Sequence, residues 1–330
     1  MNQDSGLFIE ALQRQDLAAL RKVPKADLHN HFMLGGDRKW IRENCGIQID
    51  PVTQPLASMA EMDQWSQKQI NAHFGGRSGR LIMLEATLRQ AVKDGVQVLE
   101  IGEDVWALKH FYQGDIQNLL SSWDAVRQAV APQIELRFQV GMSRHCGIDY
   151  LMEKLALFWD RPEFYALDLY GDENAQPIEN FIPIYRRARQ SGWVLKAHVG
   201  EWGSAMDVQK AVDCLDLDEV QHGLAAAQDP AVMAYLKARQ VRLNLTPSSN
   251  YLLGRVPSLA QHPIAAFKAA GIEVTINSDD VLIFDSDVSK EYLRLYQAGT
   301  LSAQQLDEIR LEGLKKLKAK AFEAMQENVA

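Results

Sequence analysis

Cysteine is scarce in this chain: its 330 residues include three, Cys45, Cys146 and Cys214. None of them forms a Cys-X-X-Cys pair, and an odd number of cysteines cannot be fully paired within one chain. This pattern excludes a disulfide framework of the kind that stabilises small secreted domains, and it indicates a reducing compartment. We therefore expect a cytoplasmic protein.

Long hydrophobic runs and an excess of basic residues are also missing. No stretch of about 18 uninterrupted apolar residues occurs, as a membrane-spanning helix would require, and residues 1–21 mix apolar with charged positions instead of forming a secretion signal. The 35 Lys and Arg residues are outnumbered by 43 Asp and Glu, giving a net charge of −8. Because no broad basic surface is available, we expect neither nucleic acid nor a membrane as a partner.

The sequence does contain a regular alternation of strand and helix patterns. Hydrophobic residues make up 47% of the chain and charged residues 24%, as in ordinary globular enzymes. Eight short apolar runs are predicted strands, at residues 26–32, 96–103, 134–141, 165–171, 194–200, 219–223, 241–246 and 273–280. Helical patterns lie between many of them, at residues 116–130, 177–190, 205–215, 230–239 and 263–270. Eight alternating units predict an α/β fold, a (β/α)8 TIM barrel, over an open doubly wound sheet.

We expect residues 1–330 to form a single barrel domain with a helical insertion after the first strand and extra C-terminal helices. The insertion covers residues 35–95, and its glycine- and arginine-rich part, residues 73–80, is expected to be a flexible connection. A mobile lid or an anion cradle involving Arg77 and Arg80 remains the alternative for that part. The tail from residue 287 to 330 is expected to be helical, with a solvated basic face formed by Lys315, Lys316, Lys318 and Lys320.

Histidines and carboxylates gather at the predicted carboxyl ends of strands, where barrel enzymes carry their chemistry. The first strand ends in two histidines whose i, i+2 spacing places both imidazoles on one face. The strand-end residues are His29, His31, His198, Glu201, His222, Asp279 and Asp280. The other histidines, His73, His110, His145 and His262, lie in loops or helix starts, where ordinary polar roles suffice. The strand-end set predicts a transition-metal site, with zinc the best match and iron, cobalt or manganese as alternatives.

Six motifs in this order resemble the adenosine deaminase family of the metal-dependent amidohydrolase superfamily. They run through nearly the whole chain, and their joint specificity is high. They are Pro24-Lys-Ala-Asp-Leu-His-Asn-His31, Leu167-Asp-Leu-Tyr-Gly-Asp-Glu173, His198-Val-Gly-Glu-Trp-Gly203, Gln221-His-Gly223, Leu245-Thr-Pro-Ser-Ser-Asn250 and Thr275-Ile-Asn-Ser-Asp-Asp280.

The resemblance implies a role for each of these strand-end residues. It implies one zinc ion per chain, with protein ligands His29, His31, His198 and Asp279. Glu201 would transfer protons, and His222 and Asp279 would position the attacking water. Gly171 and Asp280 would contact the ring of the substrate. One departure stands out, because Met33 occupies the position at which the family commonly has an acidic residue that contacts ribose.

The resemblance implies a zinc-dependent hydrolytic deaminase of a purine nucleoside, purine base or related aminated heterocycle, which releases ammonia. Met33 makes adenosine itself an expected poor substrate. Two alternatives remain: an amidohydrolase that acts on another C–N or ester bond, and an inactive purine-binding barrel. The sequence indicates a small-molecule partner and leaves the oligomeric state open.

Overall fold

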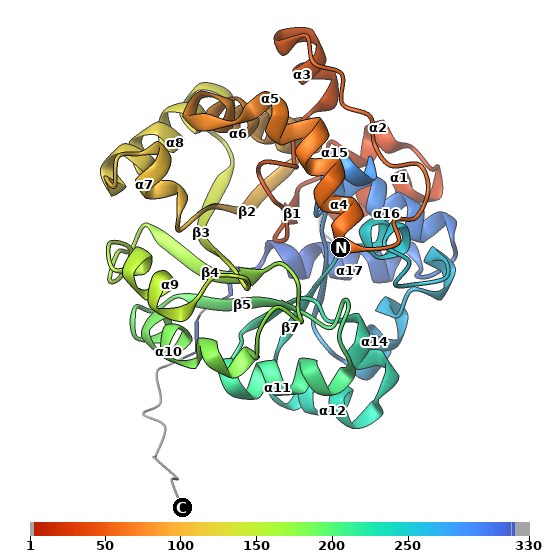
Figure 1. Ribbon diagram of the computed structural model, residues 1–330. Coiled ribbons are helices and arrows are strands. Elements are labelled where there is room, and N and C mark those ends of the chain that lie inside the picture. The colour runs from red at the N-terminus through yellow and green to blue at the C-terminus, as the bar shows by residue number, and fades with distance from the viewer. Residues whose placement is uncertain (1–2, 318, 321–330) are drawn as a thin grey trace, which may run out of the picture.

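The computed structural model describes residues 3–317, 319 and 320, and it contains an eight-stranded parallel sheet with helices around it (Figure 1). The strands are hydrogen-bonded in chain order, β1 to β8. They are β1 Lys25–Asp27, β2 Val96–Asp104, β3 Glu135–Ser143, β4 Phe164–Tyr170, β5 Val194–Val199, β6 Glu219–His222, β7 Arg242–Leu245 and β8 Val274–Ile276. A bridge between Asn30 and Asp279 joins the last strand to the first. The expected (β/α)8 barrel is confirmed.

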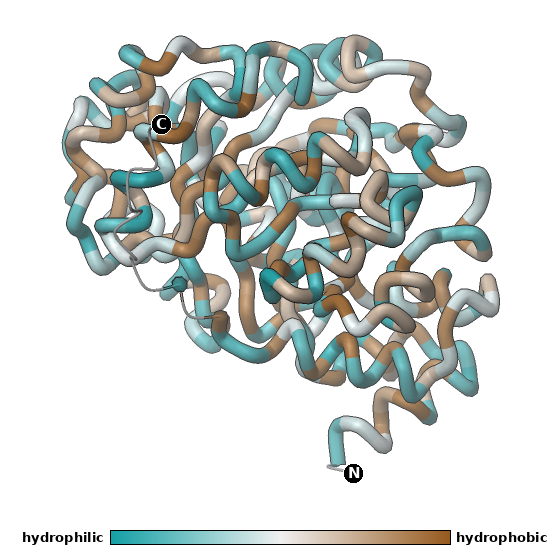
Figure 2. The backbone as a smooth tube through the Cα atoms, turned by 90° about the horizontal axis from the view of Figure 1, so that it is seen from below, coloured by the Kyte–Doolittle hydropathy of each residue, from teal (hydrophilic) through white to brown (hydrophobic). Residues whose placement is uncertain are grey.

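The helices pack an apolar face on the strands and leave polar residues outside, so teal and brown stretches alternate along the outer tube in Figure 2. Several begin at a side-chain cap, such as Asp115 before α8 and the Ser204 capping box before α11. The helices that follow β2 to β8 are α7 Ala107–Phe111, α8 Ile116–Val130, α9 Ile148–Leu155, η2 Ile178–Phe181, α10 Ile182–Gln190, α11 Ala205–Leu215, η3 Leu224–Gln228, α12 Pro230–Ala238, α13 Pro247–Leu252, η4 Leu259–Gln261, α14 Ile264–Ala270 and α15 Val281–Phe284. In the described part of the chain no helix combines the length and apolar character that crossing a bilayer requires.

The first strand is shorter than the sequence predicts. It ends at Asp27, so His29 and His31 lie beyond it and not within it. The side-chain oxygen of Asn277 accepts a hydrogen bond from Leu28 N–H at 2.8 Å, and Asp279 N–H donates to the His29 carbonyl at 2.9 Å. The first bond uses a side chain where a strand would use a backbone carbonyl, and the second belongs to the bridge between Asn30 and Asp279.

The insertion after β1 is helical throughout its second half. It comprises α3 Arg38–Cys45, α4 Met59–Ser66, the π-helix η1 Gln67–Asn71, α5 Ala72–Phe74 and α6 Gly76–Lys93. The expectation of a flexible connection at residues 73–80 was therefore wrong. Arg77 binds Asn118 and Ser122 on α8, and Arg80 is buried against Glu103 at the end of β2. Tertiary ion pairing thus stabilises a helix that begins with a glycine-rich sequence.

The N- and C-terminal helices pack against one another beside β1 and β8. α1 Gln3–Gln13 and α2 Leu17–Leu20 precede β1, while α16 Val288–Gln297 and α17 Ala303–Leu314 follow β8. α17 packs against α1, β1 and β8. Helix α17 ends at Leu314, so the expected lysine-rich helical face does not form at Lys315, Lys316 and Lys320. Lys318 lies outside the described residues.

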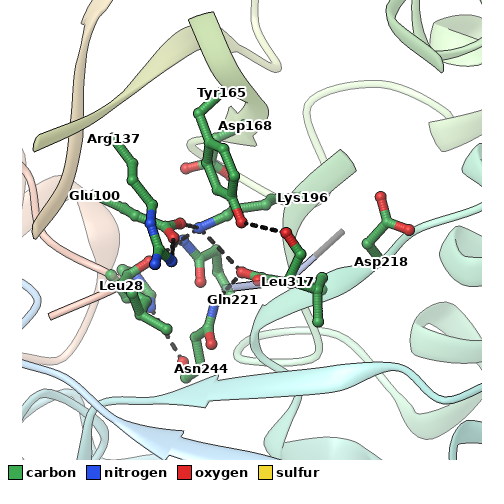
Figure 3. Close-up of polar contacts among 12 residues, drawn as sticks. Leu28, Glu100, Arg137, Tyr165, Asp168, Lys196, Asp218, Gln221, Asn244 and Leu317 are labelled. Atoms are coloured by element: carbon green, nitrogen blue, oxygen red, sulfur yellow. Dashed lines mark hydrogen bonds and ion pairs between the residues drawn. The ribbon is translucent and has the colours of Figure 1, made fainter. Parts of the chain in front are cut away.

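Charged residues inside the barrel form a network that the sequence reading missed. Lys196 on β5 pairs with Glu100 and, at 3.0 Å, with Glu219, and its ammonium also donates to the Leu28 carbonyl (Figure 3). Arg137 and Arg242 complete it by pairing with Glu100 and Glu219. The partners stand opposite each other in the strand register: Glu100 with Arg137, Lys196 with Glu219, and Glu219 with Arg242.

Candidate active site at the carboxyl ends of the strands

Three histidines and one carboxylate converge where β1, β5 and β8 end. His29 Nε2 lies 3.1 Å from His198 Nε2 and 3.5 Å from Asp279 Oδ1, and His31 Nε2 lies 3.4 Å from the same oxygen. Four ligands at about 2.0–2.1 Å from a tetrahedral zinc ion would be separated by about 3.3–3.4 Å. The three separations of 3.1–3.5 Å therefore match those of ligands that share one metal ion: His29 with His198, His29 with Asp279, and His31 with Asp279.

Hydrogen bonds behind the histidines turn their Nε2 atoms toward this point. His29 Nδ1 lies 3.2 Å from the Asn244 carbonyl oxygen, and His198 Nδ1 lies 3.2 Å from the Leu169 carbonyl oxygen. Asp168 adds a carboxylate 3.3 Å from His198 Nδ1. Because carbonyl and carboxylate oxygens only accept, each Nδ1 carries the proton and each Nε2 presents a lone pair, as metal ligation requires.

The charge states of the cluster are consistent with ligation. Burial lowers the pKa of His29 to about 3, which keeps its imidazole neutral. Although burial raises the pKa of Asp279, the neighbouring histidines, His29 first, lower it well below its usual range. Burial also opposes protonation of His31, but Asp280 and Asp279 raise its pKa to about 10. A bound cation would compete with that proton for His31.

Two of these strand-end residues adopt the left-handed backbone conformation. The φ angle is 68° at His222 and 57° at Asp279, a region that residues with a side chain rarely occupy. Such strain is tolerated where the surrounding structure requires it, commonly at functional sites. Here it turns both side chains into the same space, with the His222 and His29 rings 4.6 Å apart between centroids.

Glu201 lies beside this cluster on a loop that Glu173 holds in place. The Glu173 carboxylate accepts hydrogen bonds from the N–H groups of Gly200, Glu201 and Trp202 at 2.7–2.8 Å. Among the described residues, Glu201 Oε1 is buried and has no hydrogen-bond partner. Burial, together with the negative charges of Asp279 and Glu173, raises the pKa of Glu201 well above its usual value. A carboxyl group in this setting can hold a proton at neutral pH.

A cavity of about 360 Å³ opens over these residues and includes the positions expected to contact substrate. Gly171, Asp280 and Met33 all line it. Gly171 has a φ of 96°, which favours glycine at this position. Burial and the Asp279 carboxylate raise the pKa of Asp280 to about 8, and its Oδ1 has no partner within the described chain.

The cavity has an apolar wall and a polar wall that face it from different elements. The apolar side chains come from the insertion and nearby loops: Met33, Leu34, Met59, Met62 and Leu253. The polar wall lies at the ends of β2, β3 and β4 and includes Asp104, Gln139 and Tyr170. Arg80 Nε donates to Glu103 Oε2 at 3.0 Å, and its Nη2 lies 3.4 Å from Asp104 Oδ2.

The structure thus brings together every strand-end residue that the sequence singled out. Sequence reasoning gave no role to Glu173 or Asp104, and for Arg80 it offered a mobile lid or an anion cradle instead of an ion pair with Glu103. Glu173 was part of a quoted motif, in which it follows Gly171 and Asp172 directly at the end of β4. His145, expected to have an ordinary polar role, lines the cavity beside Gly171.

A parallel eight-stranded barrel with a histidine-rich, carboxylate-containing cluster at its carboxyl rim defines the class of metal-dependent barrel hydrolases. Comparison with known proteins identifies the family within this class. A sequence model described as adenosine deaminase matches residues 85–329, and the chain belongs to the adenosine deaminase family. It is accordingly a hydrolytic purine deaminase, as expected from the sequence.

Individual relatives agree with this assignment. A Treponema pallidum protein provisionally named adenosine/adenine deaminase is 28% identical over 288 residues, which are 87% of this chain and 96% of that protein. The crystal structure of an Arthrobacter aurescens adenine deaminase has a TM-score of 0.73 at 23% identity, covering 88% of this chain and 92% of that one. A Burkholderia ambifaria amidohydrolase with bound Zn has a TM-score of 0.74 at 18% identity, covering 95% and 87%. At these identities the two structures support the fold alone.

Proposed function

We propose that this deaminase holds one zinc ion through His29, His31, His198 and Asp279, and that it converts a 6-aminopurine or related aminated heterocycle and water into the oxo product and ammonia. The observation that carries the proposal is that His29 Nε2 lies 3.1 Å from His198 Nε2 and 3.5 Å from Asp279 Oδ1, while His31 Nε2 lies 3.4 Å from that oxygen. The bound Zn in the Burkholderia ambifaria amidohydrolase supports zinc over other transition metals.

The metal would supply Lewis-acid activation of water at neutral pH. Glu201 would deliver a proton to the ring nitrogen next to the amino-bearing carbon, and it would then help ammonia to leave. Its unpartnered oxygen and raised pKa suit a group that must both hold and release a proton. His222 and Asp279 would orient the attacking water, Gly171 would offer its backbone amide, and Asp280 would hydrogen-bond another ring nitrogen.

The walls of the cavity determine which substituent of the heterocyclic ring the site can accommodate. Met33 packs among the apolar residues of the insertion and provides no hydrogen-bond partner for a sugar hydroxyl. A hydroxyl buried without a partner costs about 1–3 kcal/mol, or roughly 5- to 150-fold in affinity. We therefore propose that adenosine is a poor substrate.

An anionic substituent is disfavoured for a separate reason. Among the described residues that line the cavity, Arg80 is the one Arg or Lys, and its guanidinium already binds Glu103 and lies beside Asp104. Tyr170 also donates its hydroxyl hydrogen to Asp104. Because no unneutralised cation faces the cavity there, we propose a substrate with an uncharged substituent or none, in place of a nucleoside phosphate.

Metal binding is tested by elemental analysis after dialysis. We expect about one equivalent of zinc per chain, since four protein ligands leave room for water. The variant His198→Ala should lose it, whereas His73→Ala, which changes an exposed histidine away from the cluster, should retain it. Full metal retention by His198→Ala would remove this ligand assignment.

Substrate choice is tested by ammonia release from adenine, adenosine, AMP, guanine derivatives and aminopterins. We expect adenosine to fall well below the best neutral heterocycle; a kcat/KM for adenosine above about 10⁵ M⁻¹s⁻¹ would refute the proposal. Met33→Asp should raise adenosine turnover relative to the free base, and Met206→Asp, at an exposed position, should not. Hydrolysis of an amide or ester without any deamination would favour the other amidohydrolase reaction, and purine binding without turnover would favour an inactive barrel.

We also propose that the chain is one domain and that it works in a reducing compartment such as the cytoplasm. A single large apolar core that includes residues from Phe8 to Ile309 supports the first point. The three cysteines, none of them in a disulfide, support the second.

A further inference from the structure

His262 is a buried histidine that the proposed chemistry does not use. It lies just before α14, is 2% exposed, and is connected to the active site through one residue, Asn250. Three hydrogen bonds link Ile264, His262, Asn250 and His222 in a row at 3.2, 3.1 and 3.2 Å. Because the first donor in the row is a backbone N–H, the direction of every following bond can be worked out.

Ile264 N–H donates to His262 Nδ1, so Nδ1 carries a lone pair. Burial lowers the pKa of His262 to about 3, which keeps the ring neutral, and a neutral imidazole has one protonated nitrogen. The proton is therefore on Nε2, which donates to Asn250 Oδ1. Reversing the Asn250 amide would place its NH₂ group against the His262 N–H, two donors facing each other.

The amide of Asn250 transmits this direction to the active site. With Oδ1 turned toward His262, its Nδ2 donates to His222 Nδ1. The Thr246 hydroxyl lies 3.1 Å from the same nitrogen and can donate to it as well. Because His222 Nδ1 accepts this hydrogen bond, it is unprotonated, and the ring proton of His222 is on Nε2. Glu201 Oε1 lies 3.6 Å from the same Nδ1, which is beyond hydrogen-bond distance.

We infer that His262 and Asn250 are positioning residues that fix His222 as the Nε2–H tautomer, which makes His222 a hydrogen-bond donor to the reacting oxygen and not a metal ligand. The inference rests on the role of His222 in the proposed function. It also decides between two possible ligand groups, because His29, His198 and His222 lie as close together as His29, His31 and Asp279. A protonated nitrogen cannot ligate, so His222 is excluded from the ligand set, which leaves His29, His31, His198 and Asp279 as proposed.

The tautomer is measured directly by ¹⁵N NMR of histidine-labelled, zinc-loaded protein without substrate. We expect His222 Nε2 to be the protonated nitrogen and Nδ1 the unprotonated one, with the His222 signals assigned by their loss in His222→Asn. Protonated Nδ1 in the wild-type protein would overturn the inference. This readout needs no turnover, so it is independent of the test of the deaminase function. Failure of the proposed function would instead appear as the absence of ammonia release from every aminated heterocycle tested.

Asn250→Asp is the sharpest variant, because it keeps the shape and the acceptor for His262 but replaces the donor to His222 by an acceptor. The proton of His222 should move to Nδ1, and kcat should fall about 10- to 100-fold, the usual effect of losing such a supporting partner, with KM and zinc content little changed. Asn44→Asp adds the same charge at an exposed site and controls for it. An unchanged His222 tautomer or an unchanged kcat in Asn250→Asp would refute the relay.

His262→Gln and His262→Ala separate hydrogen bonding from packing. The amide NH₂ of glutamine can replace the His262 donor, so His262→Gln should keep the wild-type tautomer and most of kcat. His262→Ala should lower kcat in the same range as Asn250→Asp. If His262→Ala does not fold, His262→Gln still decides the matter, since a large loss of kcat with an unaltered tautomer would contradict the inference.

Discussion

Two clusters of buried charged and polar residues lie at different depths of the same barrel. In the interior network, every oxygen of Glu100 and Glu219 has a partner among Arg137, Lys196, Arg242 and Asn244. At the rim, one oxygen each of Glu201 and Asp280 has no partner within the described residues. Glu100, Glu219 and Asp280 are buried, and the Glu201 side chain is 8% exposed.

The difference indicates what each cluster is for. A buried charge whose hydrogen-bonding and ionic partners all lie in the protein needs no ligand, and its role is to hold strands in register. A buried carboxyl group without a partner costs free energy in the folded protein, and it persists where a ligand will supply the missing contact. Activity and stability should therefore respond to different substitutions, and three variants test this separation, beginning with the largest effect.

Glu201→Gln should cost activity without stability. An amide is close in shape to the carboxyl group but cannot relay a proton, so kcat should fall about 10²- to 10⁴-fold. The melting temperature of the zinc-loaded protein should stay the same or rise, because the amide removes a buried carboxyl group whose Oε1 has no hydrogen-bond partner among the described residues. Glu163→Gln, at an exposed position, is the control. Near-normal ammonia release by Glu201→Gln would show that another residue transfers the proton.

Lys196→Met should cost stability without a direct effect on chemistry. It leaves Glu100 and Glu219 buried with one partner fewer, and removing one member of a buried ion pair costs about 3–5 kcal/mol of unfolding free energy. Urea denaturation followed by circular dichroism measures this loss. The exposed pair Lys210–Glu179 provides the control, since Lys210→Met should cost less than about 1 kcal/mol. A loss below that value for Lys196→Met would contradict the structural role of the network.

Glu291 on α16 is an intermediate case, buried but hydrogen-bonded to Ser248 N–H at 2.9 Å. Burial raises its pKa to about 7 from 4.5. The folded protein then holds this proton more tightly than the unfolded chain, so the stability contribution falls as pH rises from about 4.5 to about 7. Glu291→Gln should remove that fall, and its stability relative to wild type should increase between pH 5 and pH 8, by at most about 3 kcal/mol. Parallel pH curves for the two proteins would show that Glu291 does not titrate in this way.

Much of the barrel could be predicted because each strand is a short apolar run and each intervening helix has its own period and caps. Those signals are local, so the order β1 to β8 followed from the sequence. The end of β1 could not be predicted, since Leu28 and His29 are bonded by residues near 277–279, about 250 positions away. The lysine-rich tail also misled, because the Leu317 carbonyl and Lys320 hydrogen-bond to Tyr165, Leu217 and Asp218 of the barrel, contacts that the sequence does not reveal.

The sequence by itself determined the family, the barrel and the residues at its rim, since strand periodicity and motif order can be recognised without knowledge of any contact. Only the tertiary structure decided how buried charges are used. It placed Arg80 against Glu103 in place of a substrate anion, matched Glu100 with Arg137 across neighbouring strands, and joined His262 to His222 through Asn250. The physical reason is that a buried polar group acts through the partner that it meets in space, and those partners are distant in the chain.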